Sequence, residues 1–539
     1  MKNGGNYSRR RFLKNVGLTA AMLPLLQYCK NEALKLVLRI SGTNHILGHR
    51  LWIKDFPKPI QKIEIPYLII GGGITGLSAA RQFRKNGISD FLLLELENHL
   101  GGNASNGQNQ YSKFPLGAHY LPLPNFSDKK LLQFLEEEKI ITGYDTSGFA
   151  IFDETQLTFF PQERLFYNNS WQEGLVPKTL NEAGRDNFDT FFEKMEKYQS
   201  AKGADGKFLF DIPVKMSSAD KMVRDFDKIT MKEWLQQQGL VSETLCNYVD
   251  YCCRDDFGLG IDYVSAWAGI HYFAARKHDS TADKKENVLT WPEGNARLAQ
   301  HLKKYSEGKN LPNHLAYEVK MVDDKVEVKA FDSVKKQSVS IVADKVLMAS
   351  PQFVNQYLFE SRKQTASKFH YAPWLLATLT VRDLIDNESY PLSWDNVIYG
   401  SKGLGYVHDQ HQSLAQTETR KVITYYYSFS GPDLRKMRKE IYSGKEEKWK
   451  KLVFDDLKMA HPDIETQTES IDIHLLGHGM ISPVPGFIFG DAKAQAAKPI
   501  GNRIFFAHSD LSGISIFEEA FHQGIDAVNQ MTHAATLDS

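Results

Sequence analysis

The stretch YLIIGGGITGLSAARQFRKNG, from Tyr67 to Gly87, constrains the fold more than any other segment of this chain. Its four opening apolar residues predict a short buried strand. After the glycines, Leu77, Ala80 and Phe83 recur at helical spacing, and Gly87 stands where a helix commonly ends. A strand, a glycine turn and a helix in this order predict one βα unit of an α/β fold.

The glycines of this stretch have the spacing G-x-G-x-x-G. The first glycine permits a tight turn, the second lets the backbone approach a pyrophosphate, and the third lets the helix pack closely on the strand. The amides of the helix N-terminus then face the phosphates. A second predicted strand, FLLLE, ends on an acid at the distance where a ribose hydroxyl needs an acceptor. The predicted dinucleotide turn comprises Gly71, Gly72, Gly73, Ile74, Thr75, Gly76 and Glu95.

A glycine doublet follows the second predicted strand. In ELENHLGGN, Gly101 and Gly102 come six residues after Glu95. This pattern resembles the extended signature of FAD-dependent oxidoreductases of the flavin-containing amine oxidase superfamily, which also includes phytoene desaturases and protoporphyrinogen oxidases. The resemblance implies that the doublet makes a second backbone approach to FAD. Asn103 stands where arginine is common in the family.

Two later segments extend the resemblance. PLGAHYL resembles the family's Gly-Ala-His segment beside the flavin, and residues 502–531 resemble its C-terminal strand, turn and helix. The helix N-terminus would face the flavin C2 carbonyl, which gains negative charge on reduction. The family's Gly-Glu after the strand is His508-Ser509 here, which leaves Ser509 and Asp510 as alternative partners of the ribityl chain. The further cofactor contacts implied for non-covalently bound FAD are Gly117, Ala118, His119, Val319, Ser509, Asp510, Ile516 and Phe517.

The flavin segments lie near both ends of the chain, so the substrate part must be inserted between them. We expect an α/β fold with a Rossmann-type FAD-binding domain and an inserted α+β substrate domain with a mixed or antiparallel sheet. The expected FAD-binding segments are residues 62–145, 291–368 and 495–539, and the expected substrate-binding segments are residues 146–290 and 369–494. Residues 33–61 are expected to be a linker or N-terminal extension.

The first 32 residues predict an export signal. SRRRFLK precedes the apolar run VGLTAAMLPLL, and this order resembles the twin-arginine consensus. LLQYCKNE resembles a lipoprotein box with Cys29 as the acylated residue, although Tyr28 stands where a small residue is usual. We therefore expect an exported protein, either periplasmic or anchored to the membrane of the cell envelope through lipidated Cys29.

Composition excludes several other classes. The 539 residues carry a formal net charge of zero, whereas nucleic-acid partners usually require a basic excess. The four cysteines, Cys29, Cys246, Cys252 and Cys253, form no CxxC motif. We therefore expect no nucleic-acid partner and no metal site.

The resemblance implies transfer of a hydride equivalent from a small organic substrate to flavin N5, with an amine or polyamine favoured. Such a substrate needs a dry pocket with aromatic walls and a few carboxylates. The candidate catalytic residues are His119, Trp291, Asp395 and Tyr406. Asp395 would pair with a cationic amine, and either Trp374 or Trp394 would add a cation–π contact.

One departure from the family leaves the reaction open. Amine oxidases commonly carry a lysine, linked through water to flavin N5, where this chain has Leu376. The electron acceptor is therefore either oxygen or another acceptor. The alternative functions are an FAD-dependent dehydrogenase or desaturase of an apolar substrate, and a non-redox flavin mutase.

Overall fold

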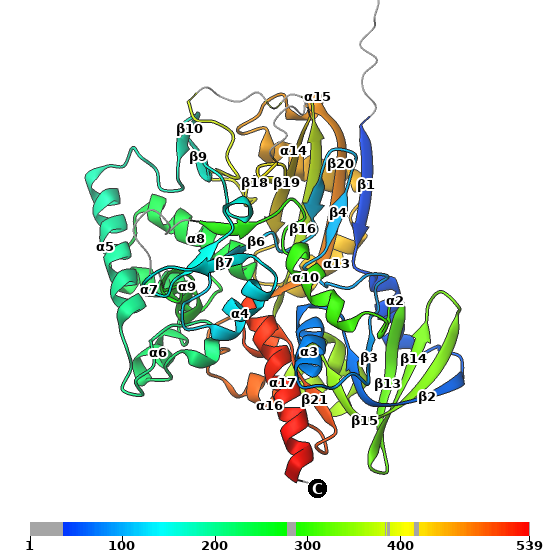
Figure 1. The fold of residues 1–539 in the computed structure, drawn as a ribbon. Coiled ribbons are helices and arrows are strands. Elements are labelled where there is room, and N and C mark those ends of the chain that lie inside the picture. Colours follow the sequence, from blue (N-terminus) through cyan, green and yellow to red (C-terminus); the bar gives the residue numbers. More distant parts are fainter. Residues whose placement is uncertain (1–35, 278–286, 383, 385–388, 414–419, 538–539) are drawn as a thin grey trace, which may run out of the picture.

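The computed structural model describes residues 36–277, 287–382, 384, 389–413 and 420–537. These residues form two large sheets with helices packed on them (Figure 1). This arrangement confirms the predicted α/β fold with a Rossmann-type domain and a second domain built on a mixed sheet. The expected export signal and Cys29 lie outside the described residues. Among the residues that are described, no helix is both long and apolar enough to cross a membrane.

A seven-stranded sheet carries the glycine turn. Its strands are β12 (Asn310–Leu311), β3 (Phe91–Leu94), β2 (Pro59–Ile70), β15 (Gln337–Met348), β14 (Lys325–Asp332), β13 (His314–Val322) and β21 (Ile504–Phe506). β2 lies between β3 and β15, and all three run parallel, as in other dinucleotide-binding sheets. β21 pairs with β15 in parallel and brings the C-terminal part of the chain to this sheet.

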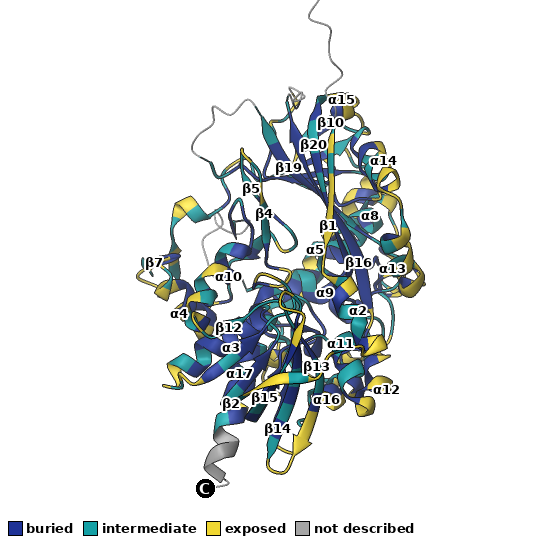
Figure 2. Ribbon diagram, turned by 90° about the vertical axis from the view of Figure 1, so that its right-hand side faces the viewer, coloured by how far each residue is buried: buried dark blue, intermediate teal, exposed yellow. Residues whose placement is uncertain are grey.

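An eight-stranded sheet forms the frame of the second domain. In spatial order its strands are β1 (Val37–Gly42), β20 (Thr468–Ile481), β16 (Tyr371–Val381), β19 (Lys421–Ser428), β18 (Tyr406–His408), β17 (Asp395–Ile398), β9 (Glu163–Tyr167) and β10 (Ser170–Glu173). Every residue of β16 is buried, as Figure 2 shows for the centre of this sheet. The helices α13 (Leu434–Ser443) and α14 (Glu446–Leu457) contribute Ile441, Trp449 and Val453 to the core under it.

A helical block completes the second domain. It consists of α5 (Glu182–Ser200), α6 (Lys221–Phe226), α7 (Met231–Gln237), α8 (Glu243–Phe257) and α9 (Ala266–Ala274). Thr230 and Glu233 form the predicted capping box at the start of α7, since each side chain bonds the backbone amide of the other residue. The apolar faces of these helices share one hydrophobic core.

Shorter elements connect the two sheets. The short strands are β4 (Asn106–Gln108), β5 (Lys113–Pro115), β6 (Tyr120–Pro122), β7 (Ile141–Tyr144), β8 (Ala150–Phe152) and β11 (Val288–Thr290). The remaining helices are α2 (His45–Ile53), α3 (Ile74–Lys85), α4 (Lys129–Glu137), α10 (Ala296–Lys303), α11 (Gln352–Leu358), α12 (Lys363–Ala366), α15 (Ile464–Gln467), α16 (Asp491–Ala497) and α17 (Phe517–Leu537).

The segment expected to be a linker, residues 33–61, contains regular structure. β1 pairs in parallel with β20 at the edge of the eight-stranded sheet. α2 buries Leu47 and Leu51 against Leu315 and Phe331 of the other sheet. The sequence pattern missed β1 because an edge strand with exposed side chains lacks the alternation of apolar and polar residues that marks a half-buried strand.

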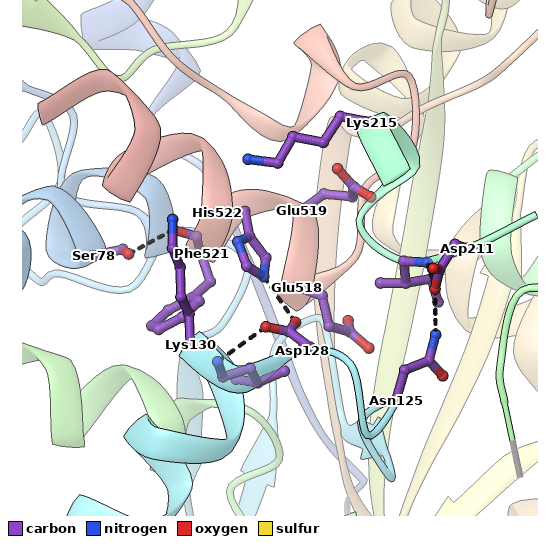
Figure 3. A network of polar contacts seen from close by, with 12 residues as sticks. Ser78, Asn125, Asp128, Lys130, Asp211, Lys215, Glu518, Glu519, Phe521 and His522 are labelled. Carbon is purple, nitrogen blue, oxygen red and sulfur yellow. Dashed lines mark hydrogen bonds and ion pairs between the residues drawn. The ribbon is translucent and has the colours of Figure 1, made fainter. Parts of the chain in front are cut away.

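Close packing of α17 on α3 joins the two ends of the chain. A Cβ atom on Gly524 would lie 2.3 Å from the Thr75 carbonyl oxygen, so only glycine fits this contact. The Ser78 hydroxyl donates a 2.7 Å hydrogen bond to the Phe521 carbonyl (Figure 3). Nearby, His522 bonds Asp128 at 2.8 Å and ties α17 to the start of α4.

The Gly524→Ala variant tests this contact. Alanine normally favours a helix over glycine by up to about 1 kcal/mol. Here the added methyl group meets backbone, so we expect the free energy of unfolding to fall by about 1–3 kcal/mol. Denaturant unfolding measures this change. Gly143→Ala is the control, since nothing lies within 4 Å of its added Cβ, and an equal loss in both variants would contradict the packing argument.

Candidate active site

The glycine turn has the geometry that a dinucleotide-binding turn requires. Gly71 has a φ of 113°, and its amide donates to the Leu94 carbonyl at 2.9 Å. The Gly101 amide donates to the Gly72 carbonyl at 2.9 Å and places the glycine doublet against the turn. A Cβ on Gly76 would lie 1.9 Å from the Gly71 carbonyl oxygen, so α3 packs on the turn without space for a side chain.

Glu95 stands at the end of β3 beside the turn. Its Oε2 accepts the Gly72 amide at 2.7 Å, and its Oε1 accepts the Glu97 amide at 2.8 Å. Burial raises the pKa of this carboxyl to about 7, while the two amides lower the pKa in part. Each carboxylate oxygen has a second lone pair, so Glu95 keeps acceptor capacity for a ribose hydroxyl.

The residues around the turn fit a dinucleotide such as FAD. A Cβ on Gly73 would meet no atom within 4 Å, although its neighbour Gly76 is in tight contact. The first bond inside α3 runs from the Leu77 amide to the Gly73 carbonyl, so the amides of Ile74 and Thr75 are free of intrahelical partners and face outward from the helix N-terminus. Phosphate oxygens are the natural acceptors for such amides.

The Gly-Ala-His segment lies against the glycine doublet. The Ala118 amide donates to the Asn103 carbonyl at 3.1 Å, and a Cβ on Gly117 would lie 2.2 Å from the same oxygen. The Asn103 side chain donates to the Gly479 carbonyl of β20 at 2.6 Å. Asn103 thus joins the two domains through its side chain, in place of the arginine common in the family. Gly102 and Ala118 themselves are exposed.

The TWPEGN turn fixes the same segment from the other side. Thr290 donates from Oγ1 to the His119 carbonyl at 2.9 Å. Asn295 donates from its amide to the Ala118 carbonyl at 3.0 Å and from Nδ2 to the Tyr120 carbonyl at 2.8 Å. The backbone from Ala118 to Tyr120 is therefore held in one position, with the His119 and Tyr120 side chains projecting from it.

The C-terminal stretch supplies a buried acceptor. Oδ2 of Asp510 accepts the Gln352 amide at 2.9 Å and the Tyr371 hydroxyl at 2.5 Å. Oδ1 has no hydrogen-bond donor among the described residues, because Nδ1 of His508, at 3.2 Å, already accepts the Asp510 amide. A hydroxyl of a bound cofactor would satisfy Oδ1. The structure therefore favours Asp510 over Ser509 as the polar partner of a dinucleotide.

The other cofactor residues expected from the family pattern lie at the start of α17 and in β13. Ile516 is half-buried before the first turn of α17, where Phe517 is buried. Val319 is buried in β13 opposite Val328. Among the described residues no group of three or more His, Cys, Asp or Glu side chains has an arrangement that could hold a metal ion.

A small pocket opens beside His119 and is called here the aromatic pocket. Its lining residues are Pro115, His119, Thr290, Trp291, Trp394, Val407, His408, Asp409 and Gln412. The ring centroids of His119 and Trp394 lie 5.7 Å apart. Burial lowers the pKa of His119 to about 3, so its imidazole is neutral at physiological pH.

Three carboxyl groups gather next to this pocket and are called here the acidic cluster: Asp255, Asp256 and Asp395. The Tyr120 hydroxyl donates to Asp255 at 3.4 Å, and the Tyr251 hydroxyl donates to Asp395 at 3.3 Å. Tyr120 packs edge-on against Trp394, with centroids 5.7 Å apart, so its ring joins the cluster to the aromatic pocket.

Burial shifts the titration of the acidic cluster, although Arg254 lowers the pKa of Asp255 in part. Desolvation raises the pKa of Asp255 to about 6, and desolvation with the neighbouring Asp255 charge raises that of Asp256 to about 7. The pKa of Asp395 lies well above its usual value, because of burial and the charges of Glu163 and Asp255. Arg276 partly offsets Asp256, but its guanidinium is already paired with Glu518 at 2.7 Å. A cationic ligand would stabilise the ionised cluster.

The four candidate catalytic residues divide into two groups. His119, Trp291 and Asp395 lie at the aromatic pocket or the acidic cluster. The Trp291 indole donates to Oε1 of Gln156 at 3.0 Å, which fixes the ring as a wall. Tyr406 is only 1% exposed and bonds Arg164 and His461 inside the eight-stranded sheet. Its position is structural, and we assign Tyr406 no role in catalysis.

Sequence reasoning missed several residues of the site. Asp255 and Asp256 lie near the end of α8, which buries its apolar face. Acidic residues on the polar face of such a helix are usually solvated. Tyr426 of β19 donates from its hydroxyl to the Gly117 carbonyl at 3.1 Å, and its ring centroid lies 4.6 Å from that of His119. The only sequence signal for Tyr426 is the aromatic run of β19, and such a run is equally typical of a buried strand.

A family model and several sequence relatives match parts of the chain. Residues 69–137 match the model of an NAD(P)-binding Rossmann-like domain. Polyamine oxidase 1 of Zea mays is 24% identical over 242 residues, which are 41% of this chain and 44% of the relative. A flavin-containing amine oxidase of Oncorhynchus mykiss is 29% identical over 115 residues, or 20% of this chain and 22% of the relative. The chain thus matches less than half the length of these relatives.

Solved structures match over a larger share. Putrescine oxidase bound to putrescine has a TM-score of 0.63 at 14% identity, covering 88% of this chain and 100% of that one. Cyclohexylamine oxidase from Brevibacterium oxydans has a TM-score of 0.63 at 13% identity, covering 88% and 99%. A fatty acid isomerase from P. acnes that produces CLA has a TM-score of 0.60 at 16% identity, covering 86% and 98%. These likenesses show that the chain has the fold of flavin amine oxidases.

The Gly73→Val variant tests the dinucleotide turn. Since no protein atom lies near the added Cβ, we expect a folded protein that retains no flavin, because the new side chain occupies the place of the pyrophosphate. Flavin absorbance of the purified protein and its circular dichroism measure the two properties. Gly143→Val, where the surroundings are also open, is the control. A yellow, fully loaded Gly73→Val protein would show that the cofactor lies elsewhere.

The raised pKa of Asp256 predicts a pH-dependent effect of Asp256→Asn. The pKa of Asp256 is higher in the folded protein than in the unfolded chain. The folded protein therefore loses stability as pH rises from the pKa of the unfolded chain through about 7. The melting temperature of Asp256→Asn relative to wild type should therefore increase between about pH 5 and about pH 8. Asp262→Asn, an exposed acid paired with Lys232, is the control. A difference that stays constant with pH would contradict the assigned burial of the charge.

Proposed function

We propose that this protein is an FAD-dependent oxidoreductase that removes a hydride equivalent from an amine. The acidic cluster carries the proposal. Three carboxyl groups with raised pKa values lie beside the Gly-Ala-His segment, among tyrosine and tryptophan rings. Such a setting favours an organic cation over a neutral or anionic substrate, because a cation restores the ionised state of the carboxyl groups. The amine substrates of the similar proteins support the same choice.

The glycine turn, Glu95, Asp510 and the N-terminus of α17 would together hold FAD. The pyrophosphate would meet the amides of the glycine turn, the ribose would meet Glu95, and the ribityl chain would meet Asp510. The N-terminus of α17, with Ile516 and Phe517, would face the flavin ring. Bound FAD supplies the acceptor for the hydride equivalent.

The residues of this chain would prepare the amine for reaction. The rings of Tyr120 and Tyr426 border the flavin-facing segment and limit the orientation of a substrate. The reacting nitrogen must be neutral when its neighbouring C–H bond breaks, so the ammonium proton has to leave. With a pKa of about 6, the Asp255 carboxylate is ionised near neutral pH and can accept that proton.

A second candidate function is dehydrogenation or isomerisation of an apolar substrate. Leu376, in the place of the family's lysine, is part of a buried apolar cluster with Trp374, Trp394 and Tyr426. The likeness to a fatty acid isomerase is compatible with it. The acidic cluster weighs against an apolar substrate, since carboxyl groups in an apolar binding site are costly.

Anaerobic titration with a panel of primary amines and diamines tests the proposed function. We expect the visible absorbance of the oxidised flavin to bleach on addition of an amine substrate. Readmitted oxygen then distinguishes the acceptor, because rapid recovery indicates an oxidase and slow recovery a dehydrogenase. If every amine leaves the flavin oxidised while an unsaturated fatty acid changes its spectrum, the second candidate replaces the first.

Asp255→Asn sharpens this test. Removal of the proton acceptor should lower kcat/KM for amines by about 10²-fold or more. Asp262→Asn, on the exposed surface, should leave kcat/KM as in wild type. Equal values for both variants would remove Asp255 from the mechanism.

A further inference from the structure

Exposed apolar side chains gather in the segment that precedes the glycine turn. Among the described residues, six of the seventeen large apolar side chains that are exposed fall between residues 37 and 60. Of the eight tryptophans only Trp52 is exposed, with an exposed fraction of 57%. A single exposed apolar residue is common, but a group of them marks a contact surface. The six residues are Val37, Ile40, Ile46, Trp52, Ile53 and Ile60.

The helix α2 carries apolar side chains on two of its faces. Leu47 and Leu51, four residues apart, pack against the seven-stranded sheet. Ile46 and Ile53, seven residues apart, share a second face of the helix, and they are 76% and 73% exposed. One apolar face is enough to hold a helix on a domain. The second face is therefore available for a contact with a partner outside the fold.

Trp52 is held in its exposed position by neighbouring rings. Its indole stacks on the His49 ring, with the centroids 3.9 Å apart and the planes at 19°. The Tyr357 ring lies 6.2 Å from the indole on the other helix that borders α2 here, α11. A tryptophan that is already oriented loses little conformational freedom when a partner covers it. The packing of Trp52 thus prepares it for a contact.

Cationic side chains border this face of α2. The helix α13 lies next to α2, since the ring centroids of Tyr442 and His45 are 4.1 Å apart, and Figure 2 shows the two helices as neighbours. Five exposed cations belong to this border: Lys54 and Lys58 after α2, and Arg435, Lys436 and Lys439 of α13.

The acids near these cations are engaged in other contacts. Asp55 pairs with Arg50 at 3.0 Å, and Glu440 pairs with Lys448 of α14. Asp433 caps α13 by accepting the Lys436 amide at 2.9 Å. The border of the apolar face therefore carries a net positive charge.

The composition of this face selects a lipid bilayer as its partner. Tryptophan and isoleucine beside lysine and arginine are typical of helices that lie in a membrane interface. Anionic head groups attract a basic border, whereas a second copy related by a two-fold axis would bring the same cations together. Interfaces between proteins are also depleted in lysine.

The course of the chain brings the same face close to a membrane. Only residues 30–36 separate β1 from Cys29, the residue expected to carry a lipid. Seven extended residues reach at most about 25 Å. β1 leads directly into α2, and both elements lie on the side of the molecule that faces the viewer in Figure 2. A lipid on Cys29 and a contact through α2 are therefore compatible with one orientation on the bilayer.

We propose that the outer face of α2 is a docking surface for a membrane with anionic phospholipids. Ile46, Trp52 and Ile53 enter the interface, while Lys54 and Lys58 meet the head groups. This surface fixes how the protein lies on the membrane. It is independent of the proposed amine oxidation, because none of its residues belongs to the candidate active site.

Binding to vesicles tests the surface on the full, FAD-loaded chain in a Cys29→Ser background, which cannot be acylated at that residue. Vesicles of equimolar phosphatidylcholine and phosphatidylglycerol are compared with phosphatidylcholine vesicles by sedimentation. We expect binding to the anionic vesicles, and we expect Trp52→Ser with Ile53→Ser to weaken it about tenfold or more. Lys54→Glu with Lys58→Glu should reduce the preference for anionic vesicles.

Val241→Ser is the matched control, since Val241 is 62% exposed between α7 and α8, away from α2. Residues 1–35 are the same in every protein apart from the shared Cys29→Ser change, so their own affinity for lipid is common to all. Flavin content and circular dichroism verify that each variant is folded. Equal vesicle affinity of the serine double variant and its parent overturns the proposal.

Fluorescence quenching locates the contact. Because Trp52 is the one exposed tryptophan, phosphatidylglycerol vesicles with brominated acyl chains should lower the emission of the parent protein, and Trp52→Phe should remove most of that loss. Binding without quenching that depends on Trp52 would place the contact elsewhere and overturn the proposal. A dimer in sedimentation velocity without lipid, dissociated by Trp52→Ser with Ile53→Ser, would also overturn it, because the face would then bind a second copy.

Discussion

The close backbone contact between α3 and α17 is the interaction on which the candidate site depends. Gly524 lies directly on Thr75, and Ser78 bonds Phe521, a residue 443 positions further along the chain. This contact brings the C-terminal stretch, which includes Asp510 and the N-terminus of α17, to the helix that follows the glycine turn. A dinucleotide that spans both places requires these two ends of the chain to meet.

The second constraint is electrostatic. Asp255, Asp256 and Asp395 of the acidic cluster are half-buried with raised pKa values, and the nearby Arg276 is engaged with Glu518. In the absence of a cation, burial of these carboxyl groups costs stability, which is consistent with a site selected for ligand binding. A cationic group would relieve the acidic cluster, which adjoins the segment that begins with Gly117 through Tyr120.

Local motifs allowed much of the fold to be predicted from sequence, because their chemistry is decided within a few residues. Gly71, Gly76 and Glu95 belong to one βα unit, and the structure shows the contacts expected of them. The sequence does not reveal the structural position of Tyr406, because its hydroxyl accepts a hydrogen bond from Arg164, 242 positions away, and its strand pairs with β17. Asp255 and Asp256 were missed because nothing in a helix sequence reveals that its polar residues face other buried acids.

The central claim is that three distant stretches of the chain surround one FAD molecule. The most direct measurement is the flavin content of the purified protein, determined by denaturing it and quantifying the released cofactor. The account predicts about one FAD per chain, released without proteolysis because the binding is non-covalent. A colourless protein that takes up no FAD on incubation would contradict it.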